Sequence, residues 1–116
     1  MRKVYTLSTC STSKRIIKEL DLVAKGFETQ DIKTSPITHN QLEEMKALAG
    51  SYEALFSRLA RKYKELGLKT EQLNESDYRN FILTDYTFLK RPVIISGDTI
   101  FIGNSKKNVE LAAQSL

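Results

Sequence analysis

The single cysteine of the chain, Cys10, is the residue best placed to do chemistry. It follows a short β-prone run and precedes Ile16, Ile17 and Leu20, whose spacing is that of one helix face. The sequence therefore places Cys10 between a strand and the first turn of a helix. Unpaired backbone N–H groups and the positive end of the helix dipole favour a thiolate there, and Lys14 adds charge nearby. We interpret Cys10 as a nucleophile with a lowered pKa.

The alternative interpretation of Cys10 is a buried structural cysteine, the common state of an isolated thiol. Its neighbours argue against this, because they are small and hydroxylated, which is unusual in a core and suitable for an anion site. These neighbours are Ser8, Thr9, Ser11, Thr12 and Ser13. We therefore favour a reactive thiol.

The spacing around Cys10 excludes two familiar thiol sites. A phosphatase-type loop needs an arginine after five intervening residues, but Arg15 follows Cys10 after four and Ile16 occupies the required position. A dithiol redox site needs a second cysteine at position 13, where the chain has Ser13. What remains is a single-thiol site that must take its resolving thiol from another molecule.

Composition and charge limit the class of protein. The chain has 116 residues, of which 41% are hydrophobic and 28% charged, so we expect one globular domain with no membrane span. We see no secretion signal at the N-terminus, and one unpaired cysteine fits a reducing compartment, so we expect a cytoplasmic protein. His39 and Cys10 are too few for a metal site, and no glycine-rich phosphate loop is present, so we expect no bound metal or cofactor.

The formal charge of +4 raises the question of nucleic-acid binding. The basic residues are spread along the chain, and the densest group, residues 58–64, is interrupted by apolar residues at helical spacing. That pattern is typical of a solvated helix face. We therefore expect no direct binding of nucleic acid.

The periodicity and turn signals predict the order of the elements. We expect a strand over 3–8, a helix over 13–25 closed by Gly26 with Val23 and Ala24 on its apolar face, and a strand over 27–32. A helix opened by a capping box at Thr38–Gln41 and ended by Gly50 follows, then a helical stretch over 52–66 with room for one break, whose apolar pattern includes Leu59 and Leu66, and a helix start at 74–77. The chain ends with strands over 91–96 and 99–102 joined by a turn at 97–98, and a last helix capped by Asn104 or Ser105 with Val109, Ala112, Ala113 and Leu116 inward. This order predicts a single α/β domain over 1–116 with the thioredoxin-like arrangement, β-α-β followed by β-β-α. We expect a mixed four-stranded sheet and a helical insert over about 38–88.

Three stretches of the sequence together resemble one known family. They are YTLSTCSTSK at 5–14, ALFSRLARKYKELGL at 54–68 and LKRPVII at 89–95. In this order and at these separations they are similar to the glutaredoxin-coupled arsenate reductases, a family that also contains the Spx-like transcriptional regulators. The resemblance implies a thioredoxin-like fold with Cys10 as nucleophile. It also implies a cis Arg91–Pro92 bond beside the cysteine loop.

The resemblance also implies which groups bind an oxyanion. Cys10 matches the catalytic thiol, Arg91 the arginine before the proline, and Arg58 best matches the arginine of the middle segment, with Arg61 as a competitor in register. Guanidinium groups suit a tetrahedral anion because they form planar forks of donors. For Arg58 and Arg91 the alternative is a surface ion pair or a stacking role. The backbone amides expected to contribute are those of Ser11, Thr12, Ser13 and Lys14.

Two departures from the family's patterns define the expected function. Arsenate reductases of this class carry a third arginine after the final hairpin, but residues 101–107 contain none, and a lysine there could partly replace it. Spx-like redox switches carry Cys-x-x-Cys, which Ser13 removes. We expect a single-thiol oxidoreductase that acts on a small oxyanion or a mixed disulfide, with glutathione and glutaredoxin resolving the adduct. The alternatives are an Spx-like regulator that binds RNA polymerase without turnover, and an inert adaptor; the substrate and the oligomeric state stay open.

Overall fold

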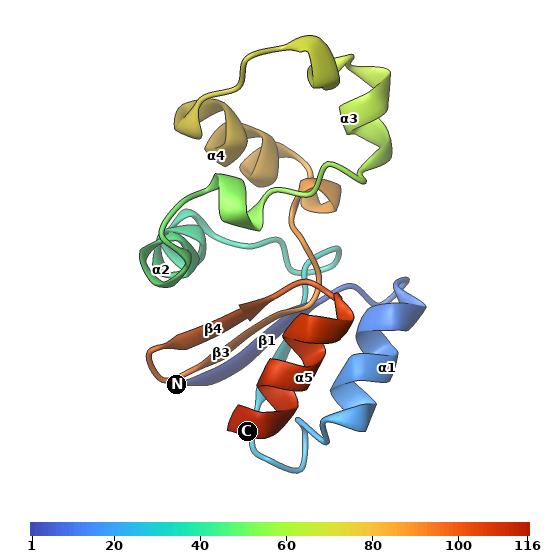
Figure 1. The fold of residues 1–116 in the computed structure, drawn as a ribbon, viewed down its shortest axis with the longest axis vertical. Helices are drawn as coiled ribbons and strands as arrows, with labels where there is room; N and C mark the ends of the chain where they lie inside the picture. Colours follow the sequence, from blue (N-terminus) through green and yellow to red (C-terminus); the bar gives the residue numbers. More distant parts are fainter. The chain divides into compact units, whose positions relative to one another are not determined.

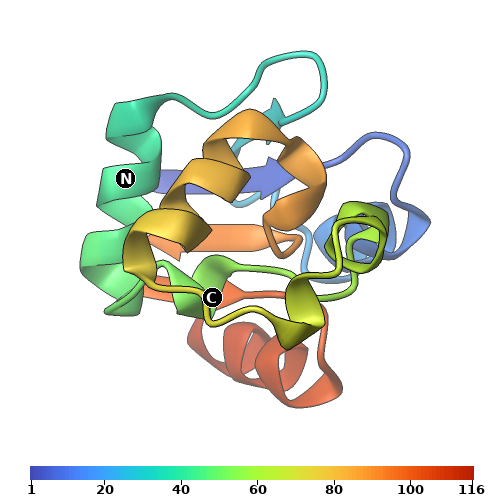
Figure 2. The same ribbon diagram turned by 90° about the horizontal axis from the view of Figure 1, so that it is seen from above.

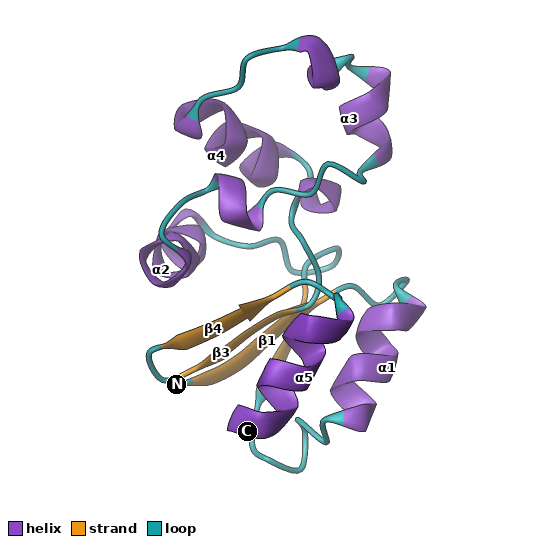
Figure 3. Ribbon diagram, viewed as in Figure 1, coloured by secondary structure: helices purple, strands orange, loops and turns teal.

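The computed structural model describes residues 1–116, which form two compact units. The sheet unit comprises residues 1–36 and 91–116, and the helical unit comprises residues 37–90. The elements are labelled in Figure 1 and coloured by type in Figure 3. The model has no helix that is both long and apolar enough to cross a membrane.

The sheet unit contains four strands in the order β2-β1-β3-β4. The strands are β1 (Arg2–Thr6), β2 (Glu28–Asp31), β3 (Val93–Ser96) and β4 (Thr99–Ile102). β1 pairs with β2 in parallel and with β3 antiparallel, and β3 pairs antiparallel with β4 through a hairpin. The strands β1, β3 and β4 lie side by side in both ribbon views (Figure 1 and Figure 2). The predicted mixed four-stranded sheet and thioredoxin-like arrangement are confirmed.

Two helices cover one face of this sheet. They are α1 (Ser11–Glu19) and α5 (Lys106–Ser115), which lie next to each other in Figure 1. Apolar side chains from both helices, from three strands and from the segment between α1 and β2 form one buried cluster beneath them. Its members are Val4, Ile16, Leu20, Leu22, Phe27, Ile94, Phe101 and Ala112. This core fixes α1, and therefore the residue at its N-terminus, against the end of β1.

The helix α1 ends at Glu19, not at 25 as the sequence predicted. Asp21 adopts a left-handed conformation with φ of 55°, and its N–H donates to the Lys18 carbonyl while the Leu22 N–H donates to that of Ile17. These two bonds form a Schellman motif, which usually has glycine at the left-handed position. The motif turns the chain so that Leu22 enters the core and is fully buried.

The residues expected to complete that helix therefore form a second turn. Gly26, with φ of 84°, closes it through bonds from its own N–H to Val23 and from Phe27 to Leu22. Val23 is 68% exposed instead of inward, and Ala24 is also exposed. The helix also begins at Ser11, two residues earlier than expected, and β1 ends at Thr6 instead of residue 8.

The helical unit contains three α-helices and three short 3₁₀ segments. They are α2 (His39–Ala49), η1 (Glu53–Leu55), α3 (Arg61–Glu65), η2 (Leu68–Thr70), α4 (Glu75–Thr84) and η3 (Tyr86–Phe88). Capping boxes open α2 at Thr38 and α4 at Asn74, and Gly50 ends α2 in a left-handed conformation, as predicted. The Phe56 ring lies at the centre of this unit and contacts the rings of Tyr63, Tyr78, Phe81 and Phe88.

The stretch over 52–66 is helical only at its two ends. Between η1 and α3 the chain is extended, because Phe56 forms a β-bridge with Leu89 and the Ser57 N–H donates to the Phe88 carbonyl. The register of an unbroken helix is lost there. Leu59 and Leu66, which belong to the apolar pattern of the predicted helical stretch, are consequently 95% and 55% exposed. In α5, which Ser105 caps, Ala112 is buried but Ala113 is exposed.

Candidate functional site

Cys10 is the N-cap residue of α1, at the strand–helix junction expected from the sequence. Its backbone is extended, with φ of −99° and ψ of 102°, and its N–H donates to the Leu7 carbonyl at 2.9 Å. This bond closes the loop that follows β1. The thiol is partly exposed and lies at the positive end of the helix dipole, where an anion is stabilised.

The Ser13 side chain contacts the sulfur directly. Its Oγ lies 3.3 Å from the Cys10 Sγ and donates a hydrogen bond to it. Ser13 is fully buried, so its hydroxyl is held in place by the helix and the core around it. A fixed donor of this kind favours the ionised form of the sulfur.

Arg91 reaches the same sulfur from the loop before β3. The peptide bond from Arg91 to Pro92 is cis, as the resemblance implied, and Pro92 is buried. Burial opposes ionisation of Cys10, but hydrogen bonds from the Ser13 hydroxyl, the Ser13 N–H and Arg91, together with the charge of Arg91, outweigh it. The pKa of the Cys10 thiol is therefore lowered from its ordinary value.

The backbone amides near Cys10 are not all available to a ligand. Ser11 and Thr12 occupy the first two helical positions, whose N–H groups have no acceptor within a helix. The Ser13 N–H faces the Cys10 sulfur, and the Lys14 N–H donates to the Cys10 carbonyl at 3.2 Å. The prediction that the Lys14 amide binds an anion is therefore wrong, because the helix itself uses it.

Arg58 belongs to the helical unit and is held by groups of that unit. Its Nη2 donates to Glu53 at 2.7 Å and to the Tyr78 hydroxyl at 3.1 Å, and its guanidinium lies 5.7 Å from the centre of the Tyr78 ring. The hydrogen bond to Glu53 raises the pKa of Arg58. The ion pair and stacking considered as alternatives are thus present, and an oxyanion role for Arg58 stays a prediction. The competitor Arg61 is exposed at the start of α3.

Sequence reasoning missed two side chains that shape the site. The sequence indicates Ser13 as a hydroxylated neighbour and as an amide donor, but not as the side chain that donates to the sulfur, although a polar residue three positions after an N-cap is a known partner of the cap. Asp31, at the end of β2, accepts hydrogen bonds from the N–H groups of Ser8 and Lys33. It thereby ties the start of the cysteine loop to the neighbouring strand. An aspartate before a turn is the signal that could have indicated this role.

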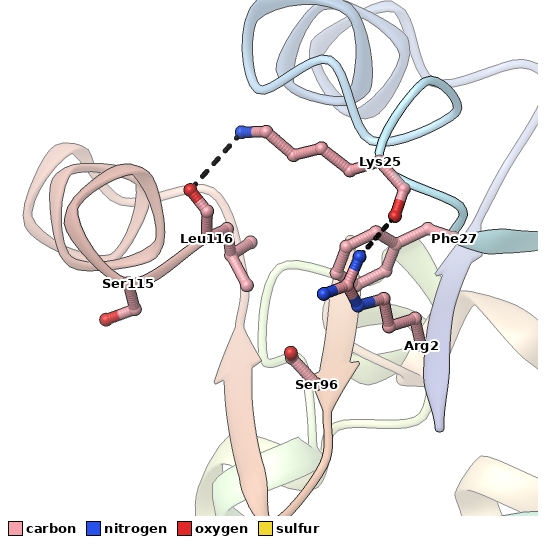
Figure 4. Close-up of a pocket in the computed structure, with 6 residues that line it drawn as sticks. All are labelled: Arg2, Lys25, Phe27, Ser96, Ser115 and Leu116. Carbon is pink, nitrogen blue, oxygen red and sulfur yellow. Dashed lines mark hydrogen bonds between the residues drawn. The ribbon is translucent and has the colours of Figure 1, made fainter.

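A pocket in the sheet unit lies away from these residues. Figure 4 shows it beside the start of β1 and the end of β3, where Arg2 donates to the Lys25 carbonyl and Lys25 to that of Leu116. Cys10 lies beyond the other end of β1, and the length of that strand is about 15 Å. With a volume of about 180 Å³ the pocket is smaller than most ligand sites. Its cations already bind main-chain carbonyls, so we assign it no part in the chemistry of Cys10.

Comparison with known proteins connects this arrangement to a family. The model of the ArsC family matches residues 5–112. No curated protein matches the sequence at a significant level.

Three solved structures illustrate the similarity. A Staphylococcus aureus COL protein solved by NMR in solution is 29% identical, with a TM-score of 0.75 over 96% of this chain and 97% of that one. A possible arsenate reductase from Streptococcus mutans UA159 is 25% identical, with a TM-score of 0.71 over 95% and 98%. The arsenate reductase from Vibrio cholerae is 17% identical, with a TM-score of 0.77 over 99% and 98%, which shows the shared fold alone.

Proposed function

The chain belongs to the ArsC family, and from the geometry of its site we propose that it is a single-thiol reductase whose nucleophile is Cys10. The observation that carries the proposal is the set of donors around one sulfur. Ser13 donates to it at 3.3 Å, Arg91 adds a hydrogen bond and a charge, and the pKa of the thiol is lowered. A thiolate available near neutral pH is what nucleophilic attack requires.

The proposed first step is attack on a tetrahedral oxyanion such as arsenate. The Cys10 sulfur forms a bond to As(V), and one oxygen leaves as water after protonation. Arg91 and the amides of Ser11 and Thr12 offset the negative charge of the thiolate and the anion. We include Arg58 as a further donor on the basis of the resemblance.

The proposed second step requires thiols from other molecules, because the chain has one cysteine and Ser13 occupies the position of a second. A glutathione thiolate attacks the Cys10 sulfur and forms a mixed disulfide. The S–As bond breaks, its electron pair reduces As(V) to As(III), and arsenite leaves. A glutaredoxin thiolate then attacks the glutathione sulfur and releases Cys10 as thiolate.

The segment after the final hairpin bears on the choice of substrate. Residues 101–107 contain no arginine, and Lys106 and Lys107 are the cations of that region. A lysine supplies charge but not a planar fork of donors, so it would hold a tetrahedral anion less specifically. A mixed disulfide of glutathione, attacked by the same thiolate, is therefore the second substrate to be tested.

The experiment is a coupled reductase assay with glutathione, glutaredoxin, glutathione reductase and NADPH. With arsenate we expect NADPH consumption, its loss in Cys10→Ser, and a kcat/KM about tenfold lower in Arg91→Lys. With a glutathione mixed disulfide, glutaredoxin is left out because its thiolate attacks the glutathione sulfur directly, and NADPH consumption above the rate with glutathione alone should be lost in Cys10→Ser. Arg15→Lys is the matched control, because Arg15 is exposed and pairs with Glu19. No turnover with either substrate would overturn the proposal.

Because residues 101–107 contain no arginine, we retain an alternative to the reductase function, an Spx-like regulator that binds RNA polymerase. A regulator of this kind without turnover needs no nucleophile. Purified RNA polymerase should then bind the wild-type chain and Cys10→Ser equally, and neither substrate should be reduced. Turnover that depends on Cys10 would exclude it.

A further inference from the structure

One segment of the helical unit carries a positive charge as large as the net charge of the whole chain. Residues 58–69, called here the basic segment, contain five basic residues and one acidic residue. Their formal charge of +4 equals that of the whole chain, so the remaining residues are balanced. The remaining basic and acidic residues cancel in total but not everywhere, since residues 2–18 contain five basic residues and no acidic one.

Three of the five cations in the basic segment form no ion pair with a carboxylate. Arg58 pairs with Glu53 at 2.7 Å, and Lys62 lies 3.6 Å from Asp85. The other three cations, Arg61, Lys64 and Lys69, are exposed and form no ion pair with an acidic side chain. The segment therefore presents a positive field to solvent.

Two large apolar side chains are exposed within the same segment. Leu59 precedes α3 and is 95% exposed, and Leu66 follows α3 and is 55% exposed. The helix itself buries none of its residues fully. It is nevertheless anchored, because Ala60 and Leu68 are buried on either side and the Tyr63 ring meets Phe56 edge-on at 6.0 Å. Because Ala60 is buried, the backbone next to Leu59 is fixed while the Leu59 side chain stays exposed to solvent.

We propose that the basic segment is a docking surface for a partner protein that presents an acidic segment with an apolar side chain. The unpaired cations select the negative charge and steer the encounter. Leu59 supplies the apolar contact. Burying an exposed leucine is favourable, and little conformational entropy is lost because the backbone is already fixed. The surface is independent of the chemistry proposed for Cys10.

Other occupants fit the same observations less well. A nucleic acid would use the cations, but it has no use for Leu59, and the aromatic ring of the segment, Tyr63, is packed against Phe56 instead of being free to stack on bases. A membrane surface would need a longer amphipathic helix than the five residues of α3. A second copy of the chain would bring like charges together.

The test measures binding of a labelled peptide by fluorescence anisotropy. The probe is a synthetic glutamate-rich peptide that carries leucines, and its matched controls replace glutamate by glutamine or leucine by serine. We expect saturable binding of the probe that weakens as salt is raised, and weaker binding of both control peptides.

Variants of the chain locate the site. Leu59→Ser should weaken binding about tenfold, and Arg61→Gln with Lys64→Gln should weaken it and reduce its salt dependence. The matched controls are Leu111→Ser and Lys106→Gln with Lys107→Gln, which change an exposed leucine and two exposed lysines of α5 and should leave binding unchanged. Circular dichroism spectra that superimpose on that of the wild type show that the variants fold.

Three results would overturn the proposal. The first is no saturable binding of the probe at low salt. The second is equal loss of binding in the α5 variants, which would indicate general charge attraction. The third is tighter binding of duplex DNA or of phosphatidylserine vesicles that is insensitive to Leu59→Ser, because it would assign the segment to one of those ligands.

Discussion

Replacing Ser13 by alanine removes the hydroxyl that donates to the Cys10 sulfur at 3.3 Å. A hydrogen bond to a charged group contributes about 1.5–3 kcal/mol when both groups are buried. Cys10 is partly exposed, so water replaces some of the lost stabilisation, and we expect a net loss of about 1 kcal/mol for the thiolate. Ser13→Ala should therefore raise the pKa of Cys10 and move the midpoint of its reactivity towards higher pH.

The rate effect should be smaller than the change in thiolate population. A loss of about 1 kcal/mol corresponds to about fivefold less thiolate below the titration midpoint. A thiolate of higher pKa is intrinsically more nucleophilic, which recovers about half of that loss on a logarithmic scale. Alkylation below the midpoint should thus slow about two- to threefold, while the rate well above the midpoint should increase slightly.

The assay is the rate of alkylation by iodoacetamide across pH, followed by mass spectrometry. Ser11→Ala is the matched control, because Ser11 is exposed and its hydroxyl makes no hydrogen bond to Cys10. An unchanged pH–rate profile in a folded Ser13→Ala protein would refute the reasoning. A shift of equal size in Ser11→Ala would refute it as well, because it would show that any change in the first turn has this effect.

Three further predictions follow from the same structure. Ser13→Cys places a second thiol beside Cys10 and should allow a disulfide under mild oxidation, measured as loss of both free thiols; two persistent thiols would contradict the observed side-chain geometry. Leu22→Ala should lower the free energy of unfolding by about 3 kcal/mol, because Leu22 is fully buried. Val23→Ala should change it by less than about 0.5 kcal/mol, because Val23 is exposed. Equal effects of the two substitutions in urea titrations would contradict the early end of α1. Burial raises the pKa of Asp85, but hydrogen bonds from the hydroxyl and N–H of Thr87, together with Lys62, outweigh it and lower the pKa. The contribution of Asp85 to stability is therefore present above the ordinary carboxyl pKa and is lost as the pH falls through the lowered pKa. Asp85→Asn should be less stable than the wild type at neutral pH and should lose stability less steeply on acidification. Parallel curves of unfolding free energy against pH for the two proteins would contradict this.

The parts of the fold that depend on local chemistry could be predicted from the sequence. The capping boxes at Thr38 and Asn74 and the helix end at Gly50 are formed by residues within one turn of each other. The parallel pairing of β1 with β2 and the hairpin of β3 with β4 follow from the alternation of elements along the chain, because parallel strands need a crossover and a two-residue turn joins an antiparallel pair. The position of Cys10 at the start of α1 has the same local origin.

The errors arise where tertiary structure overrides the local pattern. The apolar residues at Leu59 and Leu66 continue a helical period, but the β-bridge between Phe56 and Leu89 interrupts the helix, and that bridge joins residues far apart in sequence. The early end of α1 depends on Asp21 in a left-handed conformation that usually takes glycine, and Gly26 gave the more obvious stop signal.

In the candidate site, too, some features could be predicted from local sequence and others depend on the folded structure. The lone cysteine and the arginine before the proline could be identified from the sequence, since their residue types and flanking patterns are distinctive. The hydrogen bond from Ser13 to Cys10 could not, because it depends on which way the Ser13 side chain points in the first turn. The use of the Lys14 amide within the helix likewise depends on where the helix begins.

The central claim, that the fold holds Cys10 as a thiolate, is tested most directly by following the ultraviolet absorbance of the thiolate as the pH is raised. The wild-type chain should show one thiolate transition, absent in Cys10→Ser, with a midpoint below that of the same cysteine in the urea-unfolded chain. A midpoint equal to or above that of the unfolded chain would contradict the account, because the donors from Ser13 and Arg91 would then not stabilise the anion.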